Sequence, residues 1–282
     1  MPRRFETVSR REFLQAGTVG IVGAEMAAAG PAFALGGAQN RAPVKPELAL
    51  VKALVFDVFG TVVDWRTSVA REVEELARRK GLKVDGAKFA ETWRAGYGPS
   101  MNRVRKGELP WTKLDRLHRM ILDTILPDFG IVGLSEAETN ELNRAWHRLR
   151  PWPDVVAGLT RLKKKLILAP LSNGNIGLMT DMAKHSGLPW DCILGAELVR
   201  HYKPDPEVYQ SAMDFLDLKV GEVMMVAAHV GDLRAAKAGG LRAAFVPRPL
   251  EYGPAGKPDV TGDPSFDVTA KDFNDLAGQL GL

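Results

Sequence analysis

Cysteine and long apolar runs are the features that this sequence most clearly lacks. One cysteine, Cys192, occurs among 282 residues, so an internal disulfide is excluded. Beyond residue 34 no apolar run is long enough to cross a bilayer, so we expect no stable membrane anchor there. The histidine and cysteine residues also lack the spacing of a zinc site, and we predict no metal ligands.

The sequence also has only a small excess of positive over negative charge. The sequence has 38 Lys and Arg against 34 Asp and Glu, a net charge of +4, and the basic residues are spread along the chain. Nucleic-acid-binding domains concentrate positive charge in a patch or stripe, so we expect no nucleic-acid partner. Apolar residues make up 45% of the chain, which is enough for one large domain with an insert.

The first 34 residues have the composition of a targeting segment. Arg10 and Arg11 in "SRREFLQAG" precede a small apolar run that ends in an A-x-A cleavage pattern at 32–34. Residues 1–34 resemble a twin-arginine signal peptide, which implies the twin-arginine export machinery as a partner and a periplasmic or secreted location. The alternative is a chance arginine pair before an amphipathic helix. Residues 35–48 are predicted to be a linker.

From residue 49 onward, short apolar runs alternate with segments of helical periodicity. The runs predict buried parallel strands over 53–59, 166–173, 192–199, 223–229 and 242–247. This alternation predicts an α/β fold with a Rossmann-like parallel sheet and helices on both faces. We expect the core to comprise 49–67 and 150–282, and residues 68–149, which lack a strand pattern, to form a helical cap inserted after the first strand.

Polar side chains follow four of the predicted strands at their carboxyl ends. They are Asp57 after the first strand, Ser172 and Asn173 after the second, Lys203 after the third and Asp232 after the fourth. Because the carboxyl ends of parallel strands meet at one edge of a sheet, we expect these side chains to form one ligand site beneath the cap.

The order of these polar residues along the chain resembles that of the haloacid dehalogenase superfamily. The resemblance covers about residues 50–250. The motifs of that superfamily match Asp57 with Thr61, then Ser172, Lys203 and Asp232. Within the superfamily the sequence is most similar to the type II 2-haloacid dehalogenases. The resemblance implies that Asp57 is a nucleophile and that the helical insert is the cap.

Phe59 favours dehalogenase over phosphatase chemistry. Phosphatase members have an acid two residues after the nucleophile, because an alkoxide leaves poorly without a proton. A halide needs no such acid, and Phe59 is expected to line an apolar pocket instead. Phosphatase members also pair two acids in the last motif to help hold Mg²⁺. If Asp232 is the second acid of this pair, Ala228 stands at the position of the first. If Asp232 is the first acid, Ala236 stands at the position of the second. The pair is lost in either alignment, so we predict no Mg²⁺ requirement and no cofactor.

The resemblance implies hydrolysis of short (S)-2-haloalkanoic acids to 2-hydroxy acids through an ester on Asp57. Lys203 is expected to keep Asp57 ionised, since a nearby opposite charge favours the charged form, and Thr61 to orient it. Ser172 is assigned to the substrate carboxylate and Asn173 to the halide.

Further residues are assigned with alternatives left open. Asp232 is the candidate for positioning the hydrolytic water. Tyr209 matches a tyrosine near the family's site or is a half-buried helix aromatic, and His229 orients water, acts as a base or is structural.

The cap is expected to supply a cation for the departing halide. Trp93 and Arg94 match a family Trp-Arg pair, with Trp93 placed beside the substrate. Arg103 and Arg105 are rival cations.

Two other functions fit the same residues. One is a Mg²⁺-dependent phosphatase or phosphonate-cleaving relative, and the other is an exported, non-catalytic carboxylate binder. The resemblance also allows a homodimer.

Overall fold

One parallel sheet organises residues 46–282, the part of the chain that the computed structural model describes. Its order is β5-β4-β1-β6-β7-β8, and every neighbouring pair is parallel. The strands are β1 (Ala53–Phe56), β4 (Ile167–Ser172), β5 (Leu194–Gly195), β6 (Val223–Ala227), β7 (Arg242–Phe245) and β8 (Val268–Thr269). The predicted signal at 1–34 and most of the predicted linker at 35–48 lie outside the described residues.

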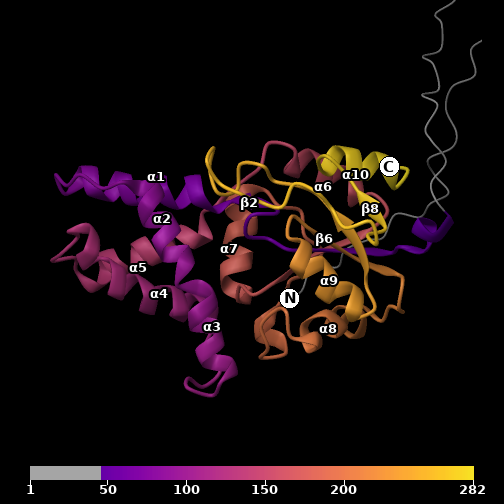
Figure 1. Cartoon of the computed structure of the whole chain (residues 1–282), viewed down its shortest axis with the longest axis horizontal. Helices are drawn as coiled ribbons and strands as arrows, with labels where there is room; N and C mark the ends of the chain where they lie inside the picture. Colours follow the sequence, from indigo (N-terminus) through magenta and orange to yellow (C-terminus); the bar gives the residue numbers. More distant parts are fainter. Residues whose placement is uncertain (1–45) are drawn as a thin grey trace, which may run out of the picture. The chain divides into compact units, whose positions relative to one another are not determined.

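Helices cover both faces of the sheet, as the strand–helix alternation predicts. Alternate residues of β1 enter two apolar clusters, with Leu54 and Phe56 in one and Ala53 and Val55 in the other. The first cluster includes α6 (Val155–Leu162), α7 (Ile176–Ser186) and α10 (Phe273–Gln279), and the second includes α8 (Pro206–Leu216) and α9 (Val230–Ala238). Figure 1 shows α6 and α10 on one side of the sheet and α8 and α9 on the other. The predicted α/β fold is therefore confirmed.

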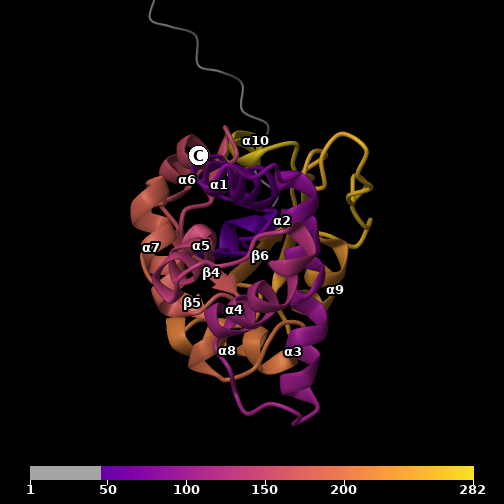
Figure 2. The same cartoon turned by 90° about the vertical axis from the view of Figure 1, so that its left-hand side faces the viewer.

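A group of helices follows the first strand. It contains α1 (Trp65–Arg79), α2 (Gly86–Ala95), α3 (Tyr97–Arg105), α4 (Leu114–Ile125) and α5 (Glu136–Asn143), with 3-10 turns η2 (Pro127–Phe129) and η3 (Arg144–His147). We call residues 65–149 the cap. Figures 1 and 2 show its helices together, at the end of the sheet where α7 begins. The short antiparallel pair β2 (Val63–Asp64) and β3 (Arg150–Pro151) joins the two ends of the cap.

Local sequence explains where several cap helices begin. The side chains of Asp64 and Asp85 accept hydrogen bonds from the backbone N–H groups of Thr67 and Lys88 at the starts of α1 and α2. Ser135 and Glu138 form a capping box at the start of α5. Because these caps satisfy backbone groups that have no partner within the helix, each helix begins at a defined residue.

Two predictions about the sheet need correction. The expected strand over 192–199 is only β5, followed by the 3-10 turn η4 (Ala196–Leu198), because the carboxylate of Glu197 turns back to accept a bond from Ile176 N. The last of the predicted strands ends at residue 247, but the chain adds a further strand, β8, beside β7. The described residues begin with the 3-10 turn η1 (Pro46–Leu50), and none of their helices is long and apolar enough to cross a membrane.

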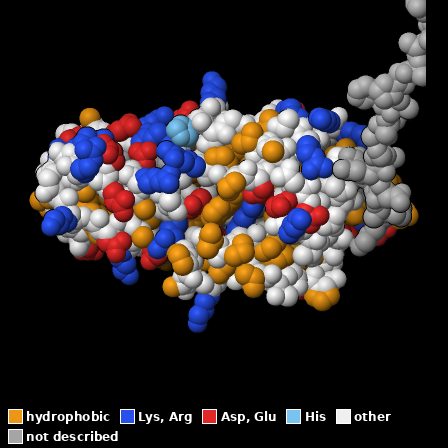
Figure 3. Space-filling view, turned by 90° about the horizontal axis from the view of Figure 1, so that it is seen from above, with side chains coloured by type: hydrophobic (Ala, Val, Ile, Leu, Met, Phe, Trp, Pro, Cys, Tyr) orange, Lys and Arg blue, Asp and Glu red, His pale blue; other side chains and the backbone are white. Residues whose placement is uncertain are grey.

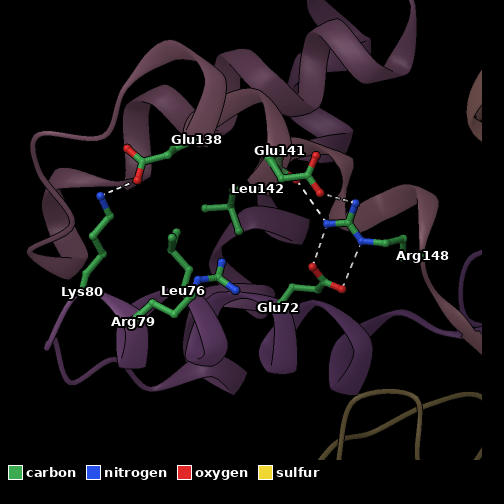
Figure 4. A pocket seen from close by; sticks show the side chains of 8 residues that line it. All are labelled: Glu72, Leu76, Arg79, Lys80, Glu138, Glu141, Leu142 and Arg148. Carbon is green, nitrogen blue, oxygen red and sulfur yellow. Dashed lines mark hydrogen bonds and ion pairs between the residues drawn. The ribbon is translucent and has the colours of Figure 1, made fainter.

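Charged side chains on the surface are mixed in sign. Acidic and basic groups lie among one another on the face in Figure 3. A hollow in the cap, lined by α1 and α5, follows the same pattern (Figure 4): Lys80 pairs with Glu138, and Arg148 pairs with Glu72 and Glu141. The charged groups of this hollow are therefore largely neutralised by one another.

Candidate active site

Asp57 lies directly after β1, at the carboxyl edge of the sheet. The residue is 8% exposed, and its backbone N–H donates to the carbonyl of Val226 in β6. Thr61 Oγ1 donates to Asp57 Oδ2 at 2.7 Å and accepts from the backbone N–H of Ala228. This pair of bonds fixes the carboxylate relative to the end of β6, as expected for a residue that orients Asp57.

Lys203 joins the two predicted carboxylates. Its Nζ atom lies 2.9 Å from Asp57 Oδ1 and 2.5 Å from Asp232 Oδ2. Tyr209 donates its hydroxyl to the other oxygen of Asp232 at 2.5 Å. Both oxygens of Asp232 are thus occupied, one by Lys203 and one by Tyr209. This geometry makes Asp232 an anchor for Lys203, and its assignment to the hydrolytic water stays a prediction.

Electrostatics keep Asp57 ionised. Burial alone would raise the pKa of Asp57, but the charge of Lys203 and the hydrogen bond from His229 outweigh burial and hold the pKa well below its ordinary value. Burial would lower the pKa of Lys203, and the charges of Asp232 and Asp57 raise it instead. At neutral pH the site therefore holds a carboxylate nucleophile beside an ammonium group.

His229 occupies the other side of Asp57. Its Nδ1 atom lies 3.1 Å from Asp57 Oδ2, and its Nε2 atom lies 2.9 Å from Glu251 Oε2. Glu251 is not among the predicted site residues, the last of which is Asp232. No local pattern marks this residue, since its partners His229 and Trp65 stand 22 and 186 positions away in the sequence.

A cavity of about 340 Å³ opens between the sheet edge and the cap. Its sheet side includes Asp57, Lys203 and Asn173, and its cap side includes Arg94 and Tyr97. The cavity has the size of a small-molecule site, and its lining combines aromatic and aliphatic side chains with a few charged groups. Phe59 and His229 also line it, as expected, beside Met101, Pro204, Tyr209, Gly231 and Asp232.

Arg94 is the cap cation that reaches this cavity. Its guanidinium carbon lies 4.0 Å from the ring centre of Tyr97 and 5.9 Å from that of Phe59, and its buried Nη1 atom has no hydrogen-bond partner among residues 46–282. The rivals point elsewhere. Arg103 pairs with Glu108, and Arg105 bonds to Asp205 and to two backbone carbonyls of the core.

Two residues that were predicted to contact the substrate, Ser172 and Trp93, do not line the cavity. Ser172 Oγ accepts a bond from Gly174 N, which turns the hydroxyl toward its own loop rather than toward a ligand. Trp93 is fully buried in the cap, where its indole N–H donates to the carbonyl of His118. In this arrangement Trp93 supports the helix that carries Arg94 and does not contact a ligand in the cavity. Asn173 does line the cavity, but its Oδ1 atom accepts from Lys203 N at 2.7 Å.

Within residues 46–282 no group of three His, Cys, Asp or Glu side chains is placed to hold a metal ion. The ammonium group of Lys203 stands between Asp57 and Asp232, the two strand-end carboxylates that would be metal ligands in a Mg²⁺ site. The predicted independence from Mg²⁺ stays a prediction that an assay must test.

Comparisons with known proteins agree with this geometry. The pattern of the haloacid dehalogenase-like hydrolase family matches residues 51–240. The crystal structure of a defluorinating L-2-haloacid dehalogenase is 50% identical, with a TM-score of 0.80, over 82% of this chain and 96% of that chain. (S)-2-haloacid dehalogenase 1 of Pseudomonas sp. (strain CBS-3) is 30% identical over 72% of this chain and 88% of its own length.

A phosphatase is also among the relatives. Phosphoglycolate phosphatase of Neisseria meningitidis serogroup A is 30% identical over 67% of this chain and 77% of its own length. Overall similarity therefore assigns the family, and the residues of the site have to separate the chemistries within it. The chain belongs to the haloacid dehalogenase-like hydrolase family.

Proposed function

We propose that this protein is a hydrolase of carbon–halogen bonds that converts short (S)-2-haloalkanoic acids to 2-hydroxy acids. One observation carries the proposal: an ionised Asp57 shares its cavity with the partly unpartnered guanidinium of Arg94, while Phe59 stands where a phosphatase needs an acid. The named haloacid dehalogenases, which are up to 50% identical over the aligned part of the chain, support the same reaction.

The first chemical step is a displacement at C2 of the substrate. A carboxylate oxygen of Asp57 forms a bond to C2, and the carbon–halogen bond breaks with its electron pair on the halide. Thr61 and Lys203 hold Asp57 in place, so the attack starts from a fixed geometry. The substrate carboxylate and the departing halide are both anions, and Lys203 and Arg94 supply cations on the two sides of the cavity.

The second step is hydrolysis of the resulting ester. Water attacks the carbonyl carbon of esterified Asp57, the acyl–oxygen bond breaks, and the 2-hydroxy acid leaves. Label from H₂¹⁸O should therefore enter Asp57 in a single turnover with excess enzyme. Label that appears directly in the 2-hydroxy acid would mean that water attacks the substrate, which contradicts the covalent scheme.

The phosphatase alternative makes a different prediction. A phosphatase needs a proton donor for the leaving alkoxide and a second acid that helps hold Mg²⁺, and Phe59 and Ala228 stand at these two positions. The test is halide release from (S)-2-chloropropionate with EDTA and with Mg²⁺, beside a phosphate ester. Halide release that EDTA leaves unchanged supports the proposal. Phosphate release that requires Mg²⁺, without halide release, would overturn it, and tight binding without turnover would indicate the carboxylate binder.

We also propose export by the twin-arginine route and, from the resemblance, a homodimer. The adjacent Arg10 and Arg11 and the A-x-A pattern at 32–34 support export. Replacing both arginines with lysine should keep the protein in the cytoplasm, as measured by cell fractionation. An unchanged distribution would exclude this route. Light scattering of the processed chain would give its oligomeric state.

A further inference from the structure

Asp57, His229 and Glu251 form a continuous chain of hydrogen-bonding groups. His229 lies between the two carboxylates, with Nδ1 toward Asp57 at 3.1 Å and Nε2 toward Glu251 at 2.9 and 3.1 Å. Glu251 is 1% exposed, whereas the His229 side chain is 26% exposed and lines the cavity. A nucleophile, a base within hydrogen-bond reach and a third group that orients the base form an arrangement that recurs in covalent catalysis.

The position of Glu251 depends on specific features of the nucleophile loop. Gly60 has φ +90°, and a Cβ atom added there would lie 2.1 Å from Glu251 Oε1. Trp65 donates its indole N–H to the same oxygen at 3.1 Å. A buried carboxylate is costly unless it is paired, and the ring of His229 is its charge partner. Glycine at position 60 thus leaves the space in which Glu251 reaches His229.

Esterification of Asp57 changes the balance around His229. In the free enzyme, burial would lower the pKa of His229, but the bonds to Asp57 and Glu251 raise it to about 10, so the ring is a cation. The ester carries no charge, so one of the two carboxylates that stabilise this cation is removed. Lys203, Asp232 and Arg94 also line the cavity beside His229, and none of them takes part in the ester. The ring then gives up a proton more easily than before.

We propose that His229 is the general base for hydrolysis of the Asp57 ester and that Glu251 is the positioning residue that holds its ring. The proposal rests on the proposed function, because it needs an ester on Asp57.

The protons balance over one turnover. After alkylation His229 loses its Nδ1 proton to solvent, which accounts for the acid that each turnover produces beside halide. Neutral His229 then accepts a proton from water as the water oxygen bonds to the carbonyl carbon of Asp57. The acyl–oxygen bond breaks, and the leaving alkoxide takes that proton. The new carboxylic acid of Asp57 transfers its proton to His229, which restores the starting ion pair.

The test separates the two chemical steps in the full-length protein. In His229→Gln, the amide cannot act as a base, so (S)-2-chloropropionate should give a burst of one halide per site followed by slow turnover. Ester hydrolysis should slow by about 10²–10⁴-fold. Intact-mass analysis of quenched samples should show the ester accumulating on Asp57. Glu251→Gln should show the same pattern with a smaller loss.

A second readout excludes a merely structural role. The hydrolysis rate of the wild type should fall at low pH as His229 stays protonated, and this limb should be absent in His229→Gln. His147→Gln is the matched control, because His147 also lies between two carboxylates, Asp115 and Asp181, but not at the cavity. It should leave the burst and the pH profile unchanged.

Several outcomes would overturn the proposal. If folded His229→Gln, checked by thermal melting, lost the halide burst itself, His229 would act in alkylation. If ester hydrolysis kept its wild-type rate and pH profile, His229 would not be the base. A wild-type profile for Glu251→Gln would remove the positioning role. A wild-type protein that releases no halide would instead refute the proposed function.

Discussion

Two histidines in this molecule each lie between two carboxylates, but their surroundings differ. His147 contacts Asp115 and Asp181 at 3.0 and 2.9 Å, at the junction of the cap with α7. His229 contacts Asp57 and Glu251 at 3.1 and 2.9 Å, at the edge of the cavity. Burial alone would lower the pKa of each histidine. The neighbouring carboxylates outweigh burial and raise the pKa of both His147 and His229.

The difference lies in what happens to the partners during the reaction. Both carboxylates beside His147 keep their charge in every state of the protein, so this ion group only contributes to stability. One carboxylate beside His229 becomes a neutral ester in each turnover. Similar local geometry therefore gives a permanent ion group in one place and a proton-transfer group in the other.

The largest effect is expected from Asp57→Asn, which removes a carboxylate that His229 contacts and His147 does not. Halide release should fall by about 10⁶-fold, because no other group of the site can form the ester. The measurement is steady-state halide release beside a thermal melt that confirms folding. Activity close to wild type would remove Asp57 from the mechanism and would make the two histidines equivalent.

A smaller loss of activity is expected from Arg94→Met. This variant extends the comparison from the two histidines to two arginines, Arg94 and Arg148. Arg94 has a buried Nη1 atom without a hydrogen-bond partner in the part of the chain that the structure describes, whereas Arg148 is paired with Glu72 and Glu141. Loss of a cation that meets an anion in a water-poor site should lower kcat/KM by about 10²–10³-fold. Arg148→Met is the control and should keep its kcat/KM. Equal losses in both variants would mean that Arg94 acts only through the fold.

The Asp57→Asn variant also tests the comparison between His229 and His147. The amide of Asn is neutral, like the ester on Asp57, so the variant reproduces the loss of charge beside His229. The pKa of His229 should fall below its wild-type value of about 10, since a carboxylate that raises it has gone. The pKa of His147 should stay unchanged. NMR titration of the histidine C–H signals measures both. An unchanged His229 would show that Glu251 alone sets its charge.

The smallest effect concerns stability against pH. The folded pKa of His229, about 10, exceeds the ordinary value of 6.5, so its charged form stabilises the fold. This contribution is complete below pH 6.5 and is lost as pH rises through about 10. His229→Gln should therefore be less stable than wild type by about 2 kcal/mol at low pH, with the gap closing toward pH 10.

The pKa of His147 is also raised, so His147→Gln should likewise be less stable than wild type at low pH. This stability difference should begin to shrink as the pH rises above 6.5. Denaturant unfolding across this range measures both variants. A gap that widens with pH for either variant would contradict the assigned charge.

Much of the fold and part of the site follow from sequence alone. Asp57, Lys203 and Asp232 could be brought together because parallel strands end at one edge, and this rule does not depend on side-chain detail. The direction of a short side chain does depend on such detail. The hydroxyl of Ser172 turns to Gly174 N, a choice made by the local loop rather than by the motif.

Long-range partners explain the other gaps. Trp93 is buried because its ring packs into the apolar cluster of the cap, where its indole N–H donates to a carbonyl 25 residues away in α4. Glu251 becomes a site residue only through Trp65 and His229, at separations that no local pattern encodes. Strand β8 is two residues long and follows a loop rich in Gly and Pro, so its periodicity is too short to recognise.

The place of β1 in the middle of the sheet has a consequence for biosynthesis. This strand carries Asp57 at its end, and its two neighbours are β4, which begins at Ile167, and β6, which begins at Val223. A growing chain therefore exposes both edges of an apolar strand until most of the protein has been made. Contacts of such long range form slowly, and exposed strand edges favour aggregation. Early folding of the cap helices, whose contacts are local, should precede the sheet, and the nucleophile should reach its partners only near the end of synthesis.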